Sequence, residues 1–317
     1  MNRTNMTNIK VNKNKGGDCF PLNSIYCTLK MKLTGNMSEK DLNKLYRCTL
    51  CNHCRTASFN QVTREKAVCN NLITPHVAKI SENINKFGNS HGVNVDFMEK
   101  KQEIMETILF KGCTPTYKAP EILTSAENLL QSSGVKYSII NNETCCGNIL
   151  FNLGDYESGL EAVRKNIKKF KAAGVKKIIT ICPGCYNAFN KYYKGQDGFN
   201  PEIILAVDLL NEPNFTGEEF LIQDPCNAKE KADDVRKILP GSKNKSASPC
   251  CGAGAGVMAH DKQLASTKAR KAVDGNTEKI ITYCPFCYLN MSSIKSDNVT
   301  DIYMLLDGEN KVHHASK

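Results

Sequence analysis

The chain has 317 residues, of which 41% are hydrophobic, so it can bury a core in two ordinary domains or in one duplicated unit with an extension. Its formal net charge is +10, but it has no tryptophan and no basic run interleaved with aromatic residues, which argues against nucleic-acid binding. No apolar run approaches the roughly 18 residues that a membrane-spanning helix needs, and the polar N-terminus lacks the apolar stretch of a signal peptide. We therefore expect a cytoplasmic protein that reaches a membrane only through a partner.

The chain contains sixteen cysteines, about 5% of its residues, which is high for an intracellular protein but below the content of a small disulfide scaffold. Without export, these thiols are expected to stay reduced. This favours metal ligation or redox catalysis over structural disulfides.

The N-terminal part predicts a polar tail followed by a short helical region. Residues 1–40 are rich in Asn and Lys and are expected to form loop. Apolar residues recur at helical spacing from Thr63 to Phe87. A turn-rich hinge is predicted at Asn89–Asn94, where glycine and asparagine gather.

From Ile104 onward, predicted strands and helices alternate. In the first half, the predicted strands are Ile104–Phe110, Lys136–Ile140 and Lys177–Ile181. The predicted helices are Pro120–Ser133 and Tyr156–Ala173, each closed by a glycine.

The second half repeats this order about a hundred residues later. Its predicted strands are Phe220–Gln223 and Lys279–Tyr283, and its predicted helices are Lys229–Leu239 and Val257–Val273. Strands that alternate with helices favour parallel sheets with helices packed on their faces.

We therefore predict an α/β fold with two pseudo-repeated parallel-sheet domains behind a small helical segment. The expected boundaries are 1–95 for the tail and helical segment, 96–212 for the first domain and 213–317 for the second. In both halves cysteines follow directly after predicted strands. Open α/β sheets bind ligands at the carboxyl ends of their strands, so the site is expected there.

Ten cysteines form two sets in the same order: a lone cysteine, an adjacent pair and a C-x-x-C. The first set is Cys113, Cys145, Cys146, Cys182 and Cys185, and the second is Cys226, Cys250, Cys251, Cys284 and Cys287. The spacings are C-x31-CC-x35-C-x2-C and C-x23-CC-x32-C-x2-C. Five thiolates that converge on one point suit a soft, multi-metal centre. The repeated order therefore predicts two such centres.

Three other uses of these thiols compete with a multi-metal centre. A structural zinc ion takes four ligands, and two adjacent cysteines reach one ion only with awkward backbone geometry. A thioredoxin-like dithiol at Cys182 and Cys185 suits a helix N-terminus but leaves the other three thiols of the set without a role. A disulfide between adjacent cysteines is strained. Iron–sulfur clusters, whose normal ligands are thiolates, explain the whole set.

Glycines close to the cysteine pairs fit the same hypothesis. Gly147, Gly252, Gly254 and Gly256 are small enough to let backbone N–H groups approach cluster sulfides. Tight turns at helix starts explain the same glycines, and the two explanations are compatible.

Three cysteines near the N-terminus have the spacing C-x2-C-x2-C, namely Cys48, Cys51 and Cys54. This is the start of a ferredoxin motif, and it predicts one cubane [4Fe-4S] cluster. Ser58 stands where the next cysteine of the motif is expected. The candidates for the remaining ligand are Cys19, Cys27 and Cys69. A zinc site that uses His53 or Cys69 is the alternative, although His53 fits a surface turn better.

The two cysteine sets resemble the cysteine-rich CCG domains of heterodisulfide reductase catalytic subunits. Related domains occur in the iron–sulfur subunits of glycerol-3-phosphate, lactate and glycolate dehydrogenases. The resemblance covers roughly residues 41–310. Its most specific pieces are Cys145-Cys146-Gly147, the segment Ile181 to Tyr186, Asp224-Pro225-Cys226, the segment Cys250 to Gly256 and the segment Tyr283 to Cys287.

The resemblance implies that each complete set binds a noncubane [4Fe-4S] cluster, and that the two clusters face a shared cavity where a disulfide is cleaved. Since both sets are complete, disulfide reduction is favoured over a relay role. One departure stands out. The family often has histidines on both sides of the second lone cysteine, where this chain has Gln223 and Asn227. Two candidate proton donors are therefore replaced by amides.

The leading hypothesis is an oxidoreductase subunit that reduces a disulfide at twin noncubane clusters. No flavin or nucleotide fingerprint is present, so an electron-donating iron–sulfur or flavin subunit, membrane-anchored or not, is expected as a partner. The alternative is an electron-relay subunit of a flavin dehydrogenase or quinone-linked complex. A scaffold whose metals only hold the fold is the third hypothesis.

Overall fold

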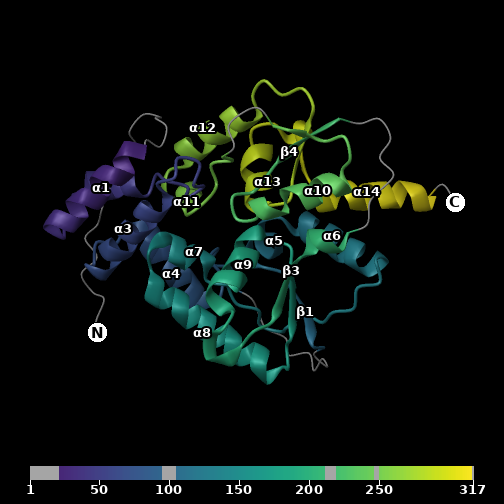
Figure 1. Cartoon of the computed structure of the whole chain (residues 1–317), viewed down its shortest axis with the longest axis horizontal. Coiled ribbons are helices and arrows are strands. Elements are labelled where there is room, and N and C mark those ends of the chain that lie inside the picture. The colour runs from purple at the N-terminus through teal and green to yellow at the C-terminus, as the bar shows by residue number, and fades with distance from the viewer. Residues whose placement is uncertain (1–20, 95–104, 211–218, 246–249, 316–317) are drawn as a thin grey trace.

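A computed structural model describes residues 21–94, 105–210, 219–245 and 250–315 of the chain. It begins with four helices, α1 (Pro21–Thr34), α2 (Glu39–Leu45), α3 (Ala57–Cys69) and α4 (Pro75–Phe87). These helices lie along one side of the molecule, as Figure 1 shows. In the described part of the chain no helix is both long and apolar enough to cross a membrane.

One prediction for this region was wrong. Residues 21–34 form a helix rather than loop, because Ser24, Cys27 and Met31 form one buried face at helical spacing. The helical spacing predicted from Thr63 to Phe87 is confirmed, but it is divided between α3 and α4. The break between them contains Asn71, which has a positive φ of 58°, and α4 starts at Pro75, whose ring suits a first helical turn.

The predicted parallel sheets are confirmed. The first sheet has the order β1-β2-β3, with β1 (Thr107–Phe110), β2 (Lys177–Thr180) and β3 (Glu202–Leu205). The second has the order β5-β4-β6-β7, with β4 (Phe220–Gln223), β5 (Lys243–Asn244), β6 (Lys279–Thr282) and β7 (Val299–Asp301). All pairings are parallel. Strands β2 and β6 have the same sequence, Lys-Ile-Ile-Thr, and both run to a C-x-x-C.

Helices pack around both sheets. In the first half they are α5 (Cys113–Lys118), α6 (Pro120–Ser132), α7 (Asn148–Leu153), α8 (Tyr156–Ala172) and α9 (Pro183–Ala188). In the second half they are α10 (Ala232–Ile238), α11 (Val257–His260), α12 (Lys262–Val273), α13 (Pro285–Ser292) and α14 (Ile302–Ala315). The predicted helices at Pro120, Tyr156 and Lys229 are present, although a short 3-10 turn precedes α10.

Two further predictions need correction. The expected strand Lys136–Ile140 is a single bridge, in which Ser138 pairs with Ile108 before the chain turns away. The expected helix Val257–Val273 is divided at Asp261. There the backbone leaves the helical region, and the Asp261 side chain accepts a hydrogen bond from the Leu264 N–H, which starts a new helix.

One hydrophobic core joins the two halves. Leu109 and Ile179 of the first sheet belong to the same buried cluster as Phe220 and Ile281 of the second. Across this core α6 packs against α14, and Asn128 donates a hydrogen bond to Asp307 at 3.1 Å. The two sheets lie on either side of this junction in Figure 1.

A buried arginine joins the helical segment to both halves. The Arg64 side chain of α3 is fully buried, and its guanidinium lies 4.8 Å from the Tyr46 ring. It donates hydrogen bonds to four backbone carbonyls, those of Leu45, Cys48, Asn152 and Ala255. These carbonyls belong to the N-terminal cysteine segment, to α7 and to the loop before α11. A single side chain therefore fixes three segments that are distant in sequence.

Replacement of this arginine is expected to be costly. Arg64→Ala leaves four carbonyls without their donor and opens a cavity, so we expect a loss of roughly 3 kcal/mol or more in unfolding free energy. Urea denaturation of anaerobically purified protein measures it. Arg164→Ala, at an exposed position of α8, is the control, with an expected change within about 0.5 kcal/mol. Equal effects of the two changes would contradict the role given to Arg64.

Candidate metal centres

The structure brings the first five cysteines together. Cys113 follows β1, the pair Cys145 and Cys146 precedes α7, and Cys182 and Cys185 lie at the start of α9. Their side chains form a continuous series of hydrogen bonds, from Cys113 to Cys145, to Cys146, to Cys185 and to Cys182. The two cysteines of the pair and those of the C-x-x-C are buried. The sulfurs of the first set thus converge as the spacing indicated.

Hydrogen bonding divides these thiols into donors and acceptors. Bonds from Cys145 and Cys185 lower the pKa of Cys146 to about 6. Hydrogen bonding with Cys146 first and Cys182 second raises the pKa of Cys185. The bond from Cys185 lowers the pKa of Cys182. The set therefore favours thiolates at Cys146 and Cys182, and thiolate is the form that binds metal.

Residues outside the motif hold the first set in place. Asn166 of α8 donates to the Cys145 carbonyl at 3.1 Å, and the Tyr193 hydroxyl donates to the Cys146 carbonyl at 3.0 Å. The Glu143 carboxylate accepts the Lys111 and Gly112 N–H groups at 2.8 and 2.7 Å, which joins the Cys113 and Cys145 loops. Burial raises the pKa of Glu143 to about 7. None of these side chains belongs to the cysteine pattern, so the sequence did not single them out.

The second set repeats the core of this arrangement. Cys287 hydrogen-bonds with Cys251 and Cys284, as Cys185 does with Cys146 and Cys182. These bonds raise the pKa of Cys287, and the bond from Cys287 lowers that of Cys251. Asn290 of α13 donates to the Cys251 carbonyl at 2.6 Å. Both halves therefore use the same contacts between the pair and the C-x-x-C.

The lone cysteine of the second set has a different position. Cys226 is exposed, and although Cys251 and Cys284 lie near enough to act on it electrostatically, it forms none of the sulfur hydrogen bonds described above. The Asp224 carboxylate, two residues earlier, pairs with Arg236 at 2.8 Å and accepts a hydrogen bond from the Tyr283 hydroxyl at 2.9 Å. These bonds hold the Cys226 loop beside Cys284. Cys226 therefore lies at the open edge of its set.

Cys51 of the N-terminal motif contacts the second set. It hydrogen-bonds with Cys250, and this bond is the main reason why the pKa of Cys51 is lowered to about 5. The Thr49 hydroxyl lies 3.2 Å from the Cys250 sulfur. A Cβ added to Gly254 would lie 2.7 Å from the Thr49 carbonyl oxygen, so only glycine allows this approach. Cys51 thus makes the contact with Cys250 that Cys113 makes with Cys145.

Three lysines surround the second set. The Lys245 ammonium donates to the Ala272 carbonyl at 2.8 Å and interacts with the charges of three thiols of the set. Burial lowers the pKa of Lys245 to about 8. Lys268 is buried and acts on Cys51 and Cys250, and Lys229 donates to the Cys51 carbonyl at 3.4 Å. These cations favour negative charge on the second set.

The remaining N-terminal cysteines are separated. Cys54 contacts the Thr56 hydroxyl, and Cys69 lies at the far end of α3, about 18 Å along the helix axis. The buried Cys27 thiol hydrogen-bonds the Asp41 carbonyl at 3.6 Å. Cys69 is therefore badly placed to complete the Cys48–Cys54 motif, whereas Cys19 lies outside the described residues. His53 lies exposed in a turn, as expected.

The donor sets fit iron–sulfur clusters in chemistry and burial. Each gathers soft sulfur ligands, and the Gly147 N–H points at the Cys145 sulfur at 3.4 Å, as N–H groups do at cluster sulfides. Within the described residues, no three Cys, His, Asp or Glu side chains surround a single point that suits one metal ion. The thiols contact one another directly instead.

The other positions singled out from the sequence lie beside these sets. A Cβ added to Gly252 or Gly256 would lie 2.6 or 2.7 Å from a neighbouring atom, so both glycines serve close packing. Gln223 is buried at the end of β4 and donates to the Asp224 carbonyl. A Cβ added to Gly184 would lie 3.8 Å from the Asn227 amide nitrogen. Asn227 therefore lies next to the first set although it follows Cys226.

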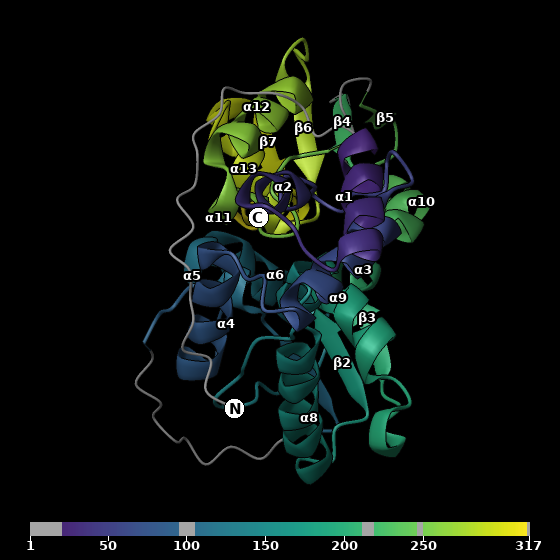
Figure 2. The same cartoon turned by 90° about the vertical axis from the view of Figure 1, so that its left-hand side faces the viewer.

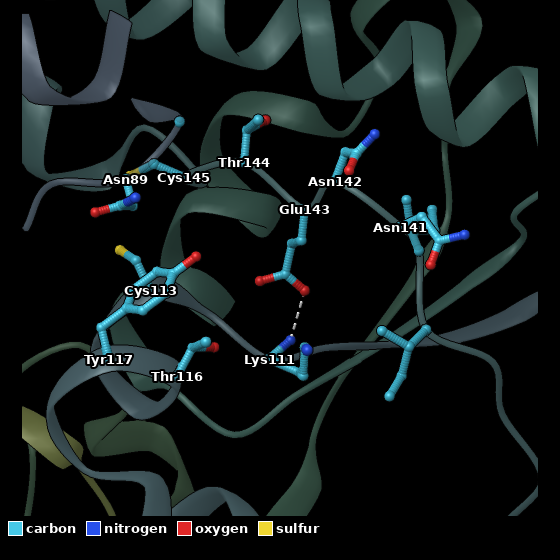
Figure 3. A pocket seen from close by; sticks show the side chains of 13 residues that line it. Asn89, Lys111, Cys113, Thr116, Tyr117, Asn141, Asn142, Glu143, Thr144 and Cys145 are labelled. Carbon is cyan, nitrogen blue, oxygen red and sulfur yellow. Dashed lines mark hydrogen bonds between the residues drawn. The ribbon is translucent and has the colours of Figure 1, made fainter. Parts of the chain in front are cut away.

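A cavity of about 250 Å³ opens on the first set. Figure 3 shows Cys113 and Cys145 on one side of it and Glu143 with Lys111 on another. Tyr117, Thr116 and several asparagines complete its wall. The cavity combines two sulfurs with polar groups that suit a small polar ligand.

Comparison with known proteins agrees with this geometry. The model of the cysteine-rich domain CCG matches residues 107–190 and 221–292, which contain all ten cysteines of the two sets. An uncharacterized iron–sulfur protein of Methanocaldococcus jannaschii is 25% identical over 77% of this chain and 56% of its own length. The chain thus spans little more than half of that relative.

Two further relatives have more specific names. One subunit of the dihydromethanophenazine:CoB–CoM heterodisulfide reductase of Methanosarcina barkeri is 25% identical over 86% of this chain and 81% of its own length. The EtfAB:quinone oxidoreductase of Syntrophomonas wolfei is 26% identical over 61% of this chain and 32% of its own.

The thiol pKa values predict a reactivity order in the reduced, metal-free protein. Hydrogen bonding keeps Cys51 a thiolate above about pH 5. Cys226 is exposed as a residue, yet the protein atoms around its sulfur first and the charge of Cys251 second raise the pKa of this thiol to about 12 and keep it protonated. At pH 7, iodoacetamide should therefore alkylate Cys51 faster than Cys226. From pH 7 to 9, labelling of Cys226 should rise about tenfold per pH unit while that of Cys51 stays level.

Peptide mass spectrometry measures both rates. Cys250→Ala, which removes the hydrogen-bond donor, should slow the labelling of Cys51 at pH 7. Parallel pH dependences for the two cysteines would refute this assignment.

Proposed function

Because this chain is a CCG cysteine-rich domain protein related to a heterodisulfide reductase subunit and to iron–sulfur oxidoreductases, we propose that it reduces a disulfide at two thiol-bound iron–sulfur centres. The observation that carries the proposal is the repeated convergence of a cysteine pair on a C-x-x-C, with the same sulfur contacts in both halves. A relay would need only one such set.

Two centres match the electron count of the reaction. Cleavage of one disulfide consumes two electrons and two protons and yields two thiols. Cys113, Cys145, Cys146, Cys182 and Cys185 would hold one noncubane [4Fe-4S] cluster, and Cys226, Cys250, Cys251, Cys284 and Cys287 the other. When bound, each cluster supplies one electron and an iron site for one sulfur. No flavin is then required at the site, and the electrons come from a partner protein.

The cavity over Cys113 and Cys145 would receive the disulfide. Its volume of about 250 Å³ suits a small molecule rather than a folded protein. Lys111 gives it a cation, and the Tyr117 hydroxyl and the asparagines give it hydrogen-bonding groups. Together they would orient an anionic disulfide with one of its sulfurs toward the first set. The proposed substrate class is thus a small disulfide with an acidic substituent.

The N-terminal motif would deliver electrons to the second set. Cys48, Cys51 and Cys54 would hold a cubane, and the contact of Cys51 with Cys250 gives a direct route from that motif to a CCG thiol. The lysines around the second set support delivery of electrons to that set, because they favour an added electron there.

A relay function is the alternative, and one observation favours it. The relative from Syntrophomonas wolfei is named for quinone reduction, so the same domain serves a protein whose named acceptor is a quinone. A relay predicts that small thiols do not alter the metal centres. The two functions are therefore separated by the spectroscopic experiment below.

Metal analysis tests the number of centres. Three four-iron clusters give about twelve iron and twelve sulfide ions per chain after anaerobic reconstitution. The double change Cys145→Ser/Cys146→Ser and its counterpart Cys250→Ser/Cys251→Ser should each remove about four iron ions. Cys69→Ser is the matched control and should remove none. About two zinc ions with no iron would refute the proposal and select a scaffold.

Thiol binding tests the reaction. Oxidised protein treated with a small anionic thiol, such as mercaptoethanesulfonate, should develop a new paramagnetic signal in electron paramagnetic resonance spectra. Lys111→Ala should raise the thiol concentration needed by about tenfold, since the cation in the cavity is lost. Lys165→Ala, an exposed position of α8, is the control. If no signal appears in wild-type protein that holds its full iron content, the relay function is correct.

A further inference from the structure

The helical segment exposes an apolar surface that no part of the described chain covers. Nine large hydrophobic side chains are exposed among the described residues, and seven of them lie on α1 and α3. They form what we call the α1–α3 apolar face: Leu22, Ile25, Tyr26, Leu29, Leu33, Phe59 and Val62. Leu33 and Leu22 retain 81% and 75% of their accessible area. Apolar area gathered in this way marks an interaction surface.

The arrangement along α1 is ordered. At 3.6 residues per turn, its five exposed apolar residues fall within about 100° of one another around the helix axis. The buried residues Ser24, Cys27 and Met31 lie on the opposite side, against the other N-terminal helices. The helix is therefore apolar on two faces, one used inside the protein and one turned outward. Figure 2 shows α1 in front, on the outside of the molecule.

Helix α3 continues the same surface. The Thr28 hydroxyl of α1 lies 2.7 Å from the Thr63 hydroxyl and 3.4 Å from the Phe59 carbonyl oxygen, so the two helices are in contact where Phe59 and Val62 begin. Helix α3 starts three residues after Cys54. The apolar face therefore adjoins the segment that carries the N-terminal cysteines.

The charges beside this face are mainly positive. On the helix wheel, Lys30 and Lys32 flank the apolar stripe on either side, and α1 has no acidic residue. The Lys44 ammonium lies 5.0 Å from the Tyr26 ring. Lys30 and Lys44 share one carboxylate, Asp41, at 2.6 and 3.6 Å, which leaves a net positive rim. An occupant with carboxylates around an apolar patch is complementary to it.

We propose that the α1–α3 apolar face is the docking surface for an acidic electron-carrier protein that reduces the centres next to Cys54. The proposal rests on the function proposed above, since it names where the electron donor binds. A second copy of this chain is a poorer occupant, because two lysine-flanked faces repel each other. A lipid surface is also poorer, because stable binding to anionic lipid takes clusters of about four or more basic residues, whereas this rim has three lysines, with the carboxylate of Asp41 among them.

Binding of an acidic two-cluster ferredoxin to the iron-loaded protein tests the proposal. In isothermal titration calorimetry the wild-type chain should bind it, with affinity that falls as salt rises. Leu29→Glu/Leu33→Glu should weaken binding by at least about tenfold, since both side chains would meet the apolar centre of the interface. Both residues point to solvent, so the fold is not at risk. Met105→Glu, at an exposed apolar residue outside the face, is the matched control.

Three outcomes would overturn the proposal: no binding by the wild-type chain, equal binding by the double variant, or binding that Met105→Glu weakens as much. A dimer in sedimentation velocity that Leu29→Glu/Leu33→Glu dissolves would assign the face to a second copy. Flotation with phosphatidylglycerol vesicles that the same variant abolishes would assign it to lipid. If binding depends on the face but small thiols leave the centres unchanged, the docking surface stands and disulfide reduction fails.

Discussion

The fold depends on one buried charge. Among the described residues no carboxylate forms an ion pair with Arg64, so its buried guanidinium depends on the four carbonyls that accept its hydrogen bonds. Those carbonyls come from three segments, and the segments must meet for the charge to be satisfied. Their meeting brings Thr49 within 3.2 Å of the Cys250 sulfur. The hydrogen bonds of Arg64 therefore position the N-terminal cysteine segment against the second thiol set, although the Arg64 side chain is not a candidate metal ligand.

The two thiol sets have the same internal contacts but different surroundings. In each, the second cysteine of the C-x-x-C bonds to the pair and to its own partner. Around the first set lie a cavity, the half-buried carboxyl of Glu143 and Lys111; around the second lie Lys229, Lys245 and Lys268. Cations stabilise negative charge and carboxylates do the opposite. The same cysteine pattern therefore lies in two different electrostatic surroundings, and negative charge is favoured more at the second set.

Much of this arrangement could be predicted from the sequence. Strands such as Lys177–Thr180 are short apolar runs that end at cysteines, and parallel pairing follows from their alternation with helices. The lone Cys113 and the pair at Cys145 were expected to meet because both follow strand ends. Helix breaks were harder to predict from the sequence. The apolar pattern continues across Asp261, but the Asp261 side chain caps a new helix, and hydrophobic periodicity gives no signal for such a cap.

Other features could not be predicted, because they depend on contacts between residues that are distant in sequence. The spacing of Cys48, Cys51 and Cys54 predicts one motif, but it does not reveal that Cys51 contacts Cys250 or that Cys69 lies at the other end of α3. The first helix was missed because the polar composition of residues 1–40 hides a short stretch with two apolar faces. Three structurally important side chains belong to no sequence motif: Glu143, Asn166 and Arg64. Their roles are seen only in the structure, from the backbone groups with which they form hydrogen bonds.

The hydrophobic core that contains side chains of both sheets has a consequence for assembly. Leu109, Ile179, Phe220 and Ile281 are buried against elements of both repeats, so neither repeat is a self-sufficient folding unit. If the polypeptide were cut between the two repeats, each fragment would expose the apolar surface that it buries against the other. Fragments made separately should recombine into one particle, which is how a protein of this architecture could be divided between two genes without losing its paired centres.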